Sequence, residues 1–83
     1  MKRARAKSKR RVQIDLSAIG RRIREVRGFD TTQAEFARRI GVAQGYLSAL
    51  EHGEKEPGAA VLLAISKEFG KSVDWLLTGL TEK

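Results

Sequence analysis

The 83-residue sequence contains no cysteine, one histidine, one proline and only 6% aromatic residues. Without cysteine there is no disulfide framework, thiolate zinc cluster or cysteine nucleophile, and one histidine excludes a multi-histidine metal site. No apolar run approaches the roughly 18 residues of a membrane span, and no apolar stretch follows the basic N-terminus as in a secretory signal. A domain this small buries only about 60% of its unfolded surface, which argues against a deep catalytic pocket. We therefore expect neither an enzyme nor a bound metal or cofactor.

The formal net charge of +7 is concentrated in residues 1–13, whereas residues 14–83 carry equal numbers of basic and acidic side chains. The basic residues of the first segment are Lys2, Arg3, Arg5, Lys7, Lys9, Arg10 and Arg11. Because the segment has no periodic apolar face, we expect it to be disordered on its own. It could serve as an arm that follows phosphates or enters a minor groove, or it could be a solubilising tail without a defined partner.

The apolar residues after this arm recur at helical spacing, and the first two helices have clear ends. Ile19, Ile23 and Val26 form one stripe of a helix over about residues 17–27. A capping box then begins the second helix, in which the Thr32 hydroxyl accepts the Glu35 amide and the Glu35 carboxylate reaches back to the Thr32 amide. This helix ends at Gly41.

Three further helices complete an all-α domain over residues 14–80, with residues 81–83 as a tail. The third spans about 44–52, and its N-cap position falls on Ala43, which offers no side-chain acceptor. The fourth starts near Pro57 and reaches about Phe69. The fifth follows Ser72 as N-cap, with an inner face made of Val73, Leu76, Leu77 and Leu80.

Residues 32–52 form a helix-turn-helix pattern, in which the second helix lies in the DNA major groove. At about 100° per residue, Leu47 and Leu50 point inward. The outward face is small, neutral and able to hydrogen-bond, as a helix that reads base edges requires. Its members are Gln44, Gly45, Ser48, Ala49 and His52.

Taken together, these spacings resemble the Cro/repressor type of helix-turn-helix, the Xre-like family of bacterial and phage regulators. The resemblance covers roughly residues 17–80 and rests on Gln33-Ala34-Glu35-Phe36-Ala37, Gly41-Val42, Leu47-Ser48, Leu50-Glu51, Gly53, Pro57 and the ending from Phe69 to Gly79. It implies a compact five-helix, lambda-repressor-like domain that binds double-stranded DNA, usually as a dimer. A cytoplasmic, nucleoid-associated protein of bacterial or phage origin is then expected.

The resemblance also implies roles for individual residues. Gln44, Gly45 and Ser48 match base readers, with Ala49 and His52 beside them, while Gln33, Tyr46 and Lys55 match phosphate contacts. Arg38 is a further phosphate candidate, with a solvated side chain as the alternative. Arg27 and Glu51 match a pair that orients the reading helix.

The chain departs from the family pattern at three places. Gly45 replaces a reader that more often carries a side chain, Ala43 replaces a hydroxyl cap, and the segment from Arg27 to Gln33 is one residue short, with Thr31 where leucine is usual.

Several alternatives remain at the level of sequence. Leu63 and Trp75 are candidate dimer contacts, although Trp75 could instead cap the core. An antitoxin that binds DNA and a toxin protein, and an interaction module that does not bind DNA, are alternative functions. Ser48 and His52 could touch across one helix face, but a nucleophilic pair also needs an orienting acid and an oxyanion hole, for which no pocket is evident.

Overall fold

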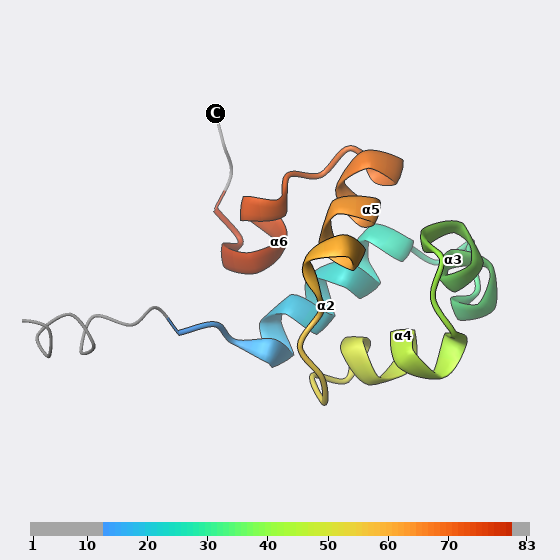
Figure 1. Cartoon of the computed structure of the whole chain (residues 1–83), viewed down its shortest axis with the longest axis horizontal. Helices are drawn as coiled ribbons and strands as arrows, with labels where there is room; N and C mark the ends of the chain where they lie inside the picture. The colour runs from blue at the N-terminus through green and yellow to red at the C-terminus, as the bar shows by residue number, and fades with distance from the viewer. Residues whose placement is uncertain (1–12, 81–83) are drawn as a thin grey trace, which may run out of the picture.

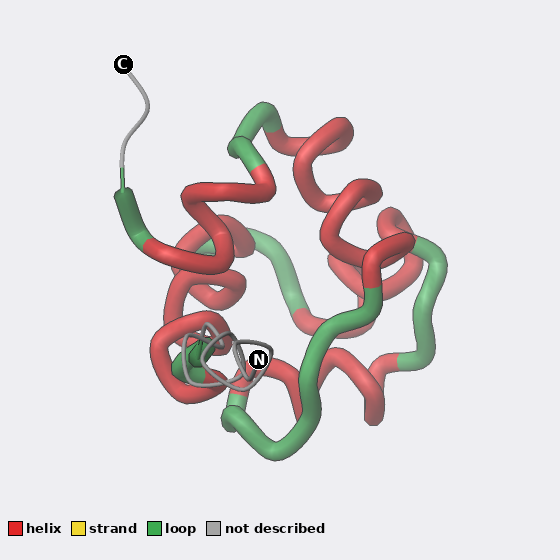
Figure 2. Tube along the Cα trace, turned by 60° about the vertical axis from the view of Figure 1, so that its left-hand side comes forward, coloured by secondary structure: helices red, strands yellow, loops and turns green. Residues whose placement is uncertain are grey.

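The computed structural model describes residues 13–80, and every regular element in that range is an α-helix (Figure 2). The helices are α2 (Leu16–Arg27), α3 (Gln33–Ile40), α4 (Gln44–Glu51), α5 (Ala59–Phe69) and α6 (Val73–Thr78). The predicted all-α, five-helix fold is therefore confirmed. The basic residues of the predicted arm all lie outside the described residues, as does the tail.

Short polar side chains begin three of the helices. Asp15 accepts a hydrogen bond from the Ala18 amide at 3.1 Å, Thr32 accepts one from Glu35 at 3.1 Å, and Ser72 accepts one from Trp75 at 2.9 Å. Each bond satisfies one of the amides that a helix leaves unpaired at its N-terminus. The caps at Thr32 and Ser72 were predicted, and α4 has no side-chain cap at Ala43, also as predicted.

The predicted roles of Glu35 and Leu80 were wrong, and two helix ends differ by one or two residues from their approximate bounds. Glu35 pairs with Arg38 at 3.0 Å, so its carboxylate is drawn along the helix instead of back to the Thr32 amide. α5 begins at Ala59, beyond Pro57, with Gly58 as N-cap. α4 stops at Glu51, so His52 is its C-cap and not its last turn. Leu80 is 67% exposed instead of part of an inner face, because α6 has already ended at Thr78.

One apolar core joins all five helices. α2 lies between α4 on one side and α5 and α6 on the other, and α3 packs against α4 and α5 (Figure 1). The Phe36 and Phe69 rings stack with centroids 4.7 Å apart and tie α3 to α5. The fully buried large side chains are Phe36, Ile19, Ile23, Leu47, Leu50, Ile65 and Leu76.

Gly20 sets how closely α2 and α4 approach. A Cβ atom at this position would lie 2.5 Å from the Leu50 carbonyl oxygen and 2.6 Å from that of Glu51. Only a residue without a side chain fits there, so the crossing depends on glycine. The last turn of α4 is thereby held directly against α2. Within residues 13–80, no helix is long and apolar enough to cross a membrane.

Candidate nucleic-acid interface

A tight left-handed turn connects α3 to α4. Gly41 has a φ of 77° and a ψ of 31°, a conformation that side chains with a Cβ disfavour. The Val42 amide then donates to the Ala37 carbonyl at 2.9 Å, which closes the end of α3. Val42 packs against the core, so the turn has a fixed direction. The helix-turn-helix predicted over about residues 32–52 is present in the structure.

α4 separates its residues into a core face and an outer face. Leu47 and Leu50 are at most 1% exposed, as the helical spacing predicted. Of the outer set, Gln44, Gly45 and His52 are exposed, whereas Ser48 and Ala49 are only half-buried and not fully outward. The outer face is therefore narrower than predicted and is centred on the N-terminal end of the helix.

His52 is oriented by the backbone of α4. Its Nδ1 atom lies 2.8 Å from the Ser48 carbonyl oxygen. Since a carbonyl only accepts, Nδ1 carries the proton of this bond, and Nε2 is left as the second polar atom of the ring. No bond joins the His52 ring to the Ser48 hydroxyl among the described residues, so the Ser–His pairing is not formed.

A buried carboxylate lies at the centre of the interface. Glu51 is 5% exposed and receives two parallel hydrogen bonds from Arg27: Nε donates to Oε2 at 2.7 Å, and Nη2 donates to Oε1 at 2.8 Å. The remaining Arg27 nitrogen, Nη1, donates to the Thr31 carbonyl at 3.0 Å. The predicted pair of Arg27 and Glu51 is confirmed, and it joins α2, α4 and the α2–α3 connection.

Two glutamine side chains extend this pair to the surface. Gln33 Nε2 donates to Glu51 Oε1 at 2.9 Å, and Gln44 Nε2 lies 3.4 Å from Gln33 Oε1. The chain of contacts runs from buried Glu51 through half-buried Gln33 to exposed Gln44. Sequence reasoning placed each residue at the interface but missed that they form one network. The spacing of these residues does not show it, because they lie 18 and 11 positions apart.

Burial and hydrogen bonding act in opposite directions on the pKa of Glu51. Desolvation of the buried carboxyl raises the pKa and is the largest single effect. The hydrogen bonds from Arg27 and Gln33, with the charges of Arg27 and Arg24, together outweigh it and lower the pKa below its ordinary value. The same hydrogen bond with Glu51 raises the pKa of Arg27. The carboxylate is thus ionised at neutral pH and acts only as an acceptor.

The remaining predicted phosphate contacts differ in their exposure. Tyr46 is half-buried and packs against the core, whereas Lys55 is exposed in the loop after α4. Arg38 is 69% exposed and paired with Glu35.

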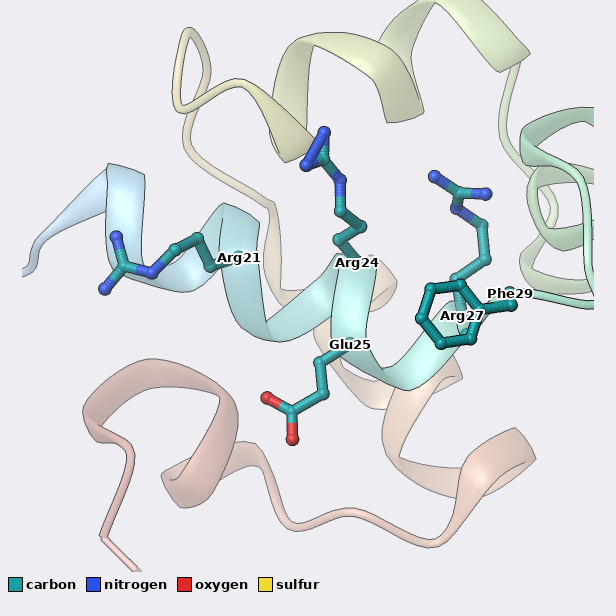
Figure 3. Close-up of a pocket in the computed structure, with 6 residues that line it drawn as sticks. Arg21, Arg24, Glu25, Arg27 and Phe29 are labelled. Atoms are coloured by element: carbon teal, nitrogen blue, oxygen red, sulfur yellow. The ribbon is translucent and has the colours of Figure 1, made fainter.

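Two arginines of α2 have contacts that the sequence did not reveal. Arg24 Nε lies 3.9 Å from Glu51 Oε1, and Figure 3 shows Arg24 and Arg27 both extending from α2 toward α4. Arg22 is half-buried and donates to the Leu76 carbonyl at 2.9 Å, at the end of α6. Arg22 is therefore partly covered, because α6 packs over that part of α2.

Comparison with known proteins also finds a helix-turn-helix in this chain. Residues 21–76 match the model of a helix-turn-helix family. The chain is 37% identical over 65 residues to the propionyl-CoA carboxylase regulator of Cereibacter sphaeroides, a match that covers 77% of this chain and 14% of that protein. The chain therefore spans only about one seventh of the length of this relative.

Several solved structures share this fold. The P22 c2 repressor in complex with a synthetic operator has a TM-score of 0.70 and 36% identity, over 83% of this chain and 100% of that one. The clp gene regulator ClgR of Corynebacterium glutamicum has a TM-score of 0.66 and 32% identity, over 77% and 69% of the two chains. The restriction–modification controller C.AhdI of Aeromonas hydrophila, at 23% identity, shares the fold with a TM-score of 0.68 over 76% and 97%.

Proposed function

The chain belongs to the helix-turn-helix family of DNA-binding transcriptional regulators, and we propose that it is a homodimeric repressor that reads operator sequence with α4 in the major groove. The observation that carries this proposal is the hydrogen-bonded chain that ends at Gln44. The similarity to the P22 c2 repressor, solved on an operator, supports it. The site of action would be the nucleoid of a bacterium or of a phage-infected cell.

The ionised carboxylate of Glu51 decides which way both amides point. Because Glu51 only accepts, Gln33 must direct Nε2 toward it and Oε1 toward Gln44. Gln44 must then donate one N–H to Gln33. Its second N–H and its Oε1 remain for DNA, and this donor and acceptor match N7 and the N6 amino group of adenine. We infer that Gln44 specifies an adenine.

Phosphate contacts would position α4 without carrying sequence information. Gln33 has a second N–H beyond its bond to Glu51, and it lies at the N-terminus of α3, where the helix dipole favours an anion. Tyr46 and Lys55 are further candidates from the family resemblance, and Arg38 is a candidate from its place on the helix surface. For Arg38, the phosphate would have to displace the exposed ion pair with Glu35, which costs little.

Selection from a randomised duplex pool at about 0.15 M salt tests the proposal directly. We expect an enriched palindrome whose half-sites are about one helical turn, or a multiple of it, apart. Salt-sensitive binding without any enriched sequence would contradict sequence-specific reading, because phosphate contacts alone give that behaviour.

The variant Gln44→Ala then tests the reading residue. It should weaken operator binding by about 1–3 kcal/mol and relax the preference for one adenine, with little change on random DNA. Ser48→Ala on α4 and Ser66→Ala on α5 form a matched pair, and only the first should affect the operator. Equal losses of Gln44→Ala on operator and random DNA would show that Gln44 does not read a base.

We propose that Leu63 on α5 and Trp75 on α6 both contribute to a dimer interface. Leu63 is 52% exposed on α5, and burial of such a side chain favours association. Trp75 is only half-buried and packs against the core, with the Lys71 ammonium 5.1 Å from its ring centroid. It therefore suits both roles that the sequence left open: one part of the ring faces the core and the rest is available to a second copy.

Sedimentation of the Leu63→Glu variant tests this surface. We expect a shift from dimer to monomer, because a charge in an apolar interface has no partner. Phe29→Glu, which places the same charge on an exposed apolar side chain in the α2–α3 loop, should leave the dimer intact. A dimer unchanged by Leu63→Glu would contradict the assignment, and a co-purified second protein would favour the antitoxin alternative.

A further inference from the structure

A groove runs along the outer side of α2 and the loop that follows it. It is lined by Arg21, Arg24, Glu25, Arg27, Gly28 and Phe29 (Figure 3). None of the base or phosphate contacts described above requires this groove. Its lining nevertheless combines three basic side chains, one carboxylate and one aromatic ring, and two of the basic side chains reach Glu51 of α4.

Phe29 is the most exposed large apolar side chain of the described residues, at 105% relative accessibility. Single exposed apolar side chains are common, so exposure alone is not informative. This ring, however, borders the groove, in a loop that leaves α2 at Gly28 with a φ of 75°. A Phe placed there adds nothing to the core and is available to a binding partner.

The groove has an excess of positive charge. Glu51 takes both parallel bonds of Arg27, but Arg24 approaches it only to 3.9 Å and stays 57% exposed. Arg21 is exposed, and within residues 13–80 it forms no ion pair. Glu25 is the one acidic residue of the lining, and its carboxylate lies on the side of α2 opposite α4, away from Arg24 (Figure 3). The groove therefore suits an anionic occupant with an apolar part.

The groove is also continuous with the proposed DNA interface. Arg24 and Arg27 line it and at the same time contact Glu51 at the end of α4. When α4 occupies the major groove, a sugar–phosphate strand passes beside the elements that support it. Arg21 and Arg24 are three residues apart on one helix, about 5–6 Å between Cβ atoms, so their long side chains can follow neighbouring phosphates of one strand.

We propose that this groove binds the DNA strand that flanks each half-site, with phosphates on Arg21 and Arg24 and the Phe29 ring against deoxyribose. This inference rests on the proposed DNA-binding function and extends the recognised site beyond the bases that α4 reads. The contact adds affinity without adding sequence specificity, because phosphates and sugars are the same at every base pair.

The experiment compares two duplexes with the full chain. The short duplex ends at the outermost specified base pair of the selected operator, and the long one extends it on both sides by about ten base pairs of arbitrary sequence, roughly one helical turn. We expect the wild-type protein to bind the long duplex more tightly. Arg21→Ala and Phe29→Ala should remove at least half of that gain while leaving affinity for the short duplex within about twofold. Both side chains are exposed, so the variants should fold, which thermal unfolding checks.

The salt dependence of binding separates the contribution of the Arg21 charge from that of the Phe29 ring. On the long duplex, Arg21→Ala should lower the slope of log affinity against log salt by about one, because one phosphate is no longer neutralised. Phe29→Ala should weaken binding without changing the slope, since the ring carries no charge. Lys67→Ala and Leu80→Ala are matched controls that remove an exposed charge and an exposed apolar side chain elsewhere, and both should behave as wild type.

The outcomes for the groove and for the proposed function are distinguishable. Specific binding of the short duplex by the wild-type protein tests sequence reading alone. If Arg21→Ala and Phe29→Ala gain as much from the extension as the wild type does, the flanking contact is absent and the proposal is wrong. It is equally wrong if a peptide of alternating glutamate and leucine, and not the long duplex, shifts the amide resonances of residues 21–29, because the groove is then a protein-docking surface.

Discussion

At the scale of single residues, the buried Glu51 carboxylate has the greatest influence on the interface. Burying a charge is costly unless it is paired and hydrogen-bonded, and Glu51 meets both conditions through Arg27 and Gln33. Such a pair adds little net stability compared with apolar residues, but it specifies an arrangement. Here it aligns the two glutamine amides and couples a buried charge to the proposed adenine contact.

The pKa of Glu51 predicts how stability changes with pH. An unfolded glutamate titrates near pH 4.3, whereas the pKa in the folded chain is lower. The stabilisation is therefore complete above about pH 4.3 and is lost as the pH falls through the folded pKa, because only the unfolded state binds the proton between the two values. Glu51→Gln should cost about 3–5 kcal/mol at pH 7, since Arg27 is left without its charge partner.

Urea unfolding of wild type and Glu51→Gln between pH 7 and pH 3 checks this prediction. The difference in unfolding free energy between the two proteins should shrink as the pH is lowered. A difference that stays constant across this range would mean that Glu51 does not carry the pH dependence. Glu54→Gln, which neutralises an exposed carboxylate in the following loop, is the control and should show no such convergence.

At the scale of elements, the position of α4 depends on its crossing with α2. The Leu50 and Glu51 carbonyls lie so close to Gly20 that no side chain fits between the helices. The same crossing brings Arg24 and Arg27 within reach of Glu51. The separation of α2 and α4 therefore sets both the tilt of the reading helix and the geometry of the ion pair beneath it.

Gly20→Ala should destabilise the fold and displace α4. The added methyl group would force the two backbones apart, at an expected cost of about 1–3 kcal/mol. Operator affinity should fall more than affinity for random DNA, because only base reading requires the correct tilt. Thermal unfolding and binding to both kinds of duplex measure the two effects.

Gly45→Ala is the matched control for this substitution. A Cβ at Gly45 meets no atom within 4 Å. Alanine is also more favourable than glycine inside a helix, by up to about 1 kcal/mol. This variant should be at least as stable as wild type. Wild-type stability of Gly20→Ala would show that the crossing can relax and does not depend on glycine.

At the scale of the whole molecule, charge is divided between two parts of the chain. Residues 14–83 are neutral overall, and the +7 net charge belongs to residues 1–13. A neutral domain can read bases, but it gains little from long-range attraction to DNA. We infer that the basic segment supplies most of the salt-dependent part of the affinity, whereas α4 supplies the discrimination.

Deletion of residues 1–11 should reduce the salt dependence of binding on every DNA sequence. The slope of log affinity against log salt should fall by up to about 0.9 for each phosphate that the segment neutralises in the wild-type complex. The ratio of operator to random affinity should change little. Titrations of both duplexes between about 0.05 and 0.2 M salt measure this, and an unchanged slope would show that the segment does not contact DNA.

Much of the fold could be predicted from local sequence because the signals that create it are local. The spacing of Ile19, Ile23 and Val26, the cap at Thr32 and the turn at Gly41 act within a few residues and specify helices and their ends. The exposure of Leu80 was misjudged, because the apolar spacing continues past Thr78 whereas α6 ends there.

The sequence by itself therefore determined the five helices, the two inward leucines of α4 and the division of charge, whereas the pairing of Arg27 with Glu51 was expected only from the family resemblance. Only the tertiary structure decided that Gln33 links Glu51 to Gln44, that Arg22 holds the end of α6, and that Phe29 lies beside a basic groove. The physical reason is that helical periodicity and caps act over three or four residues. A hydrogen bond between residues 18 or 54 positions apart exists only after the helices have packed.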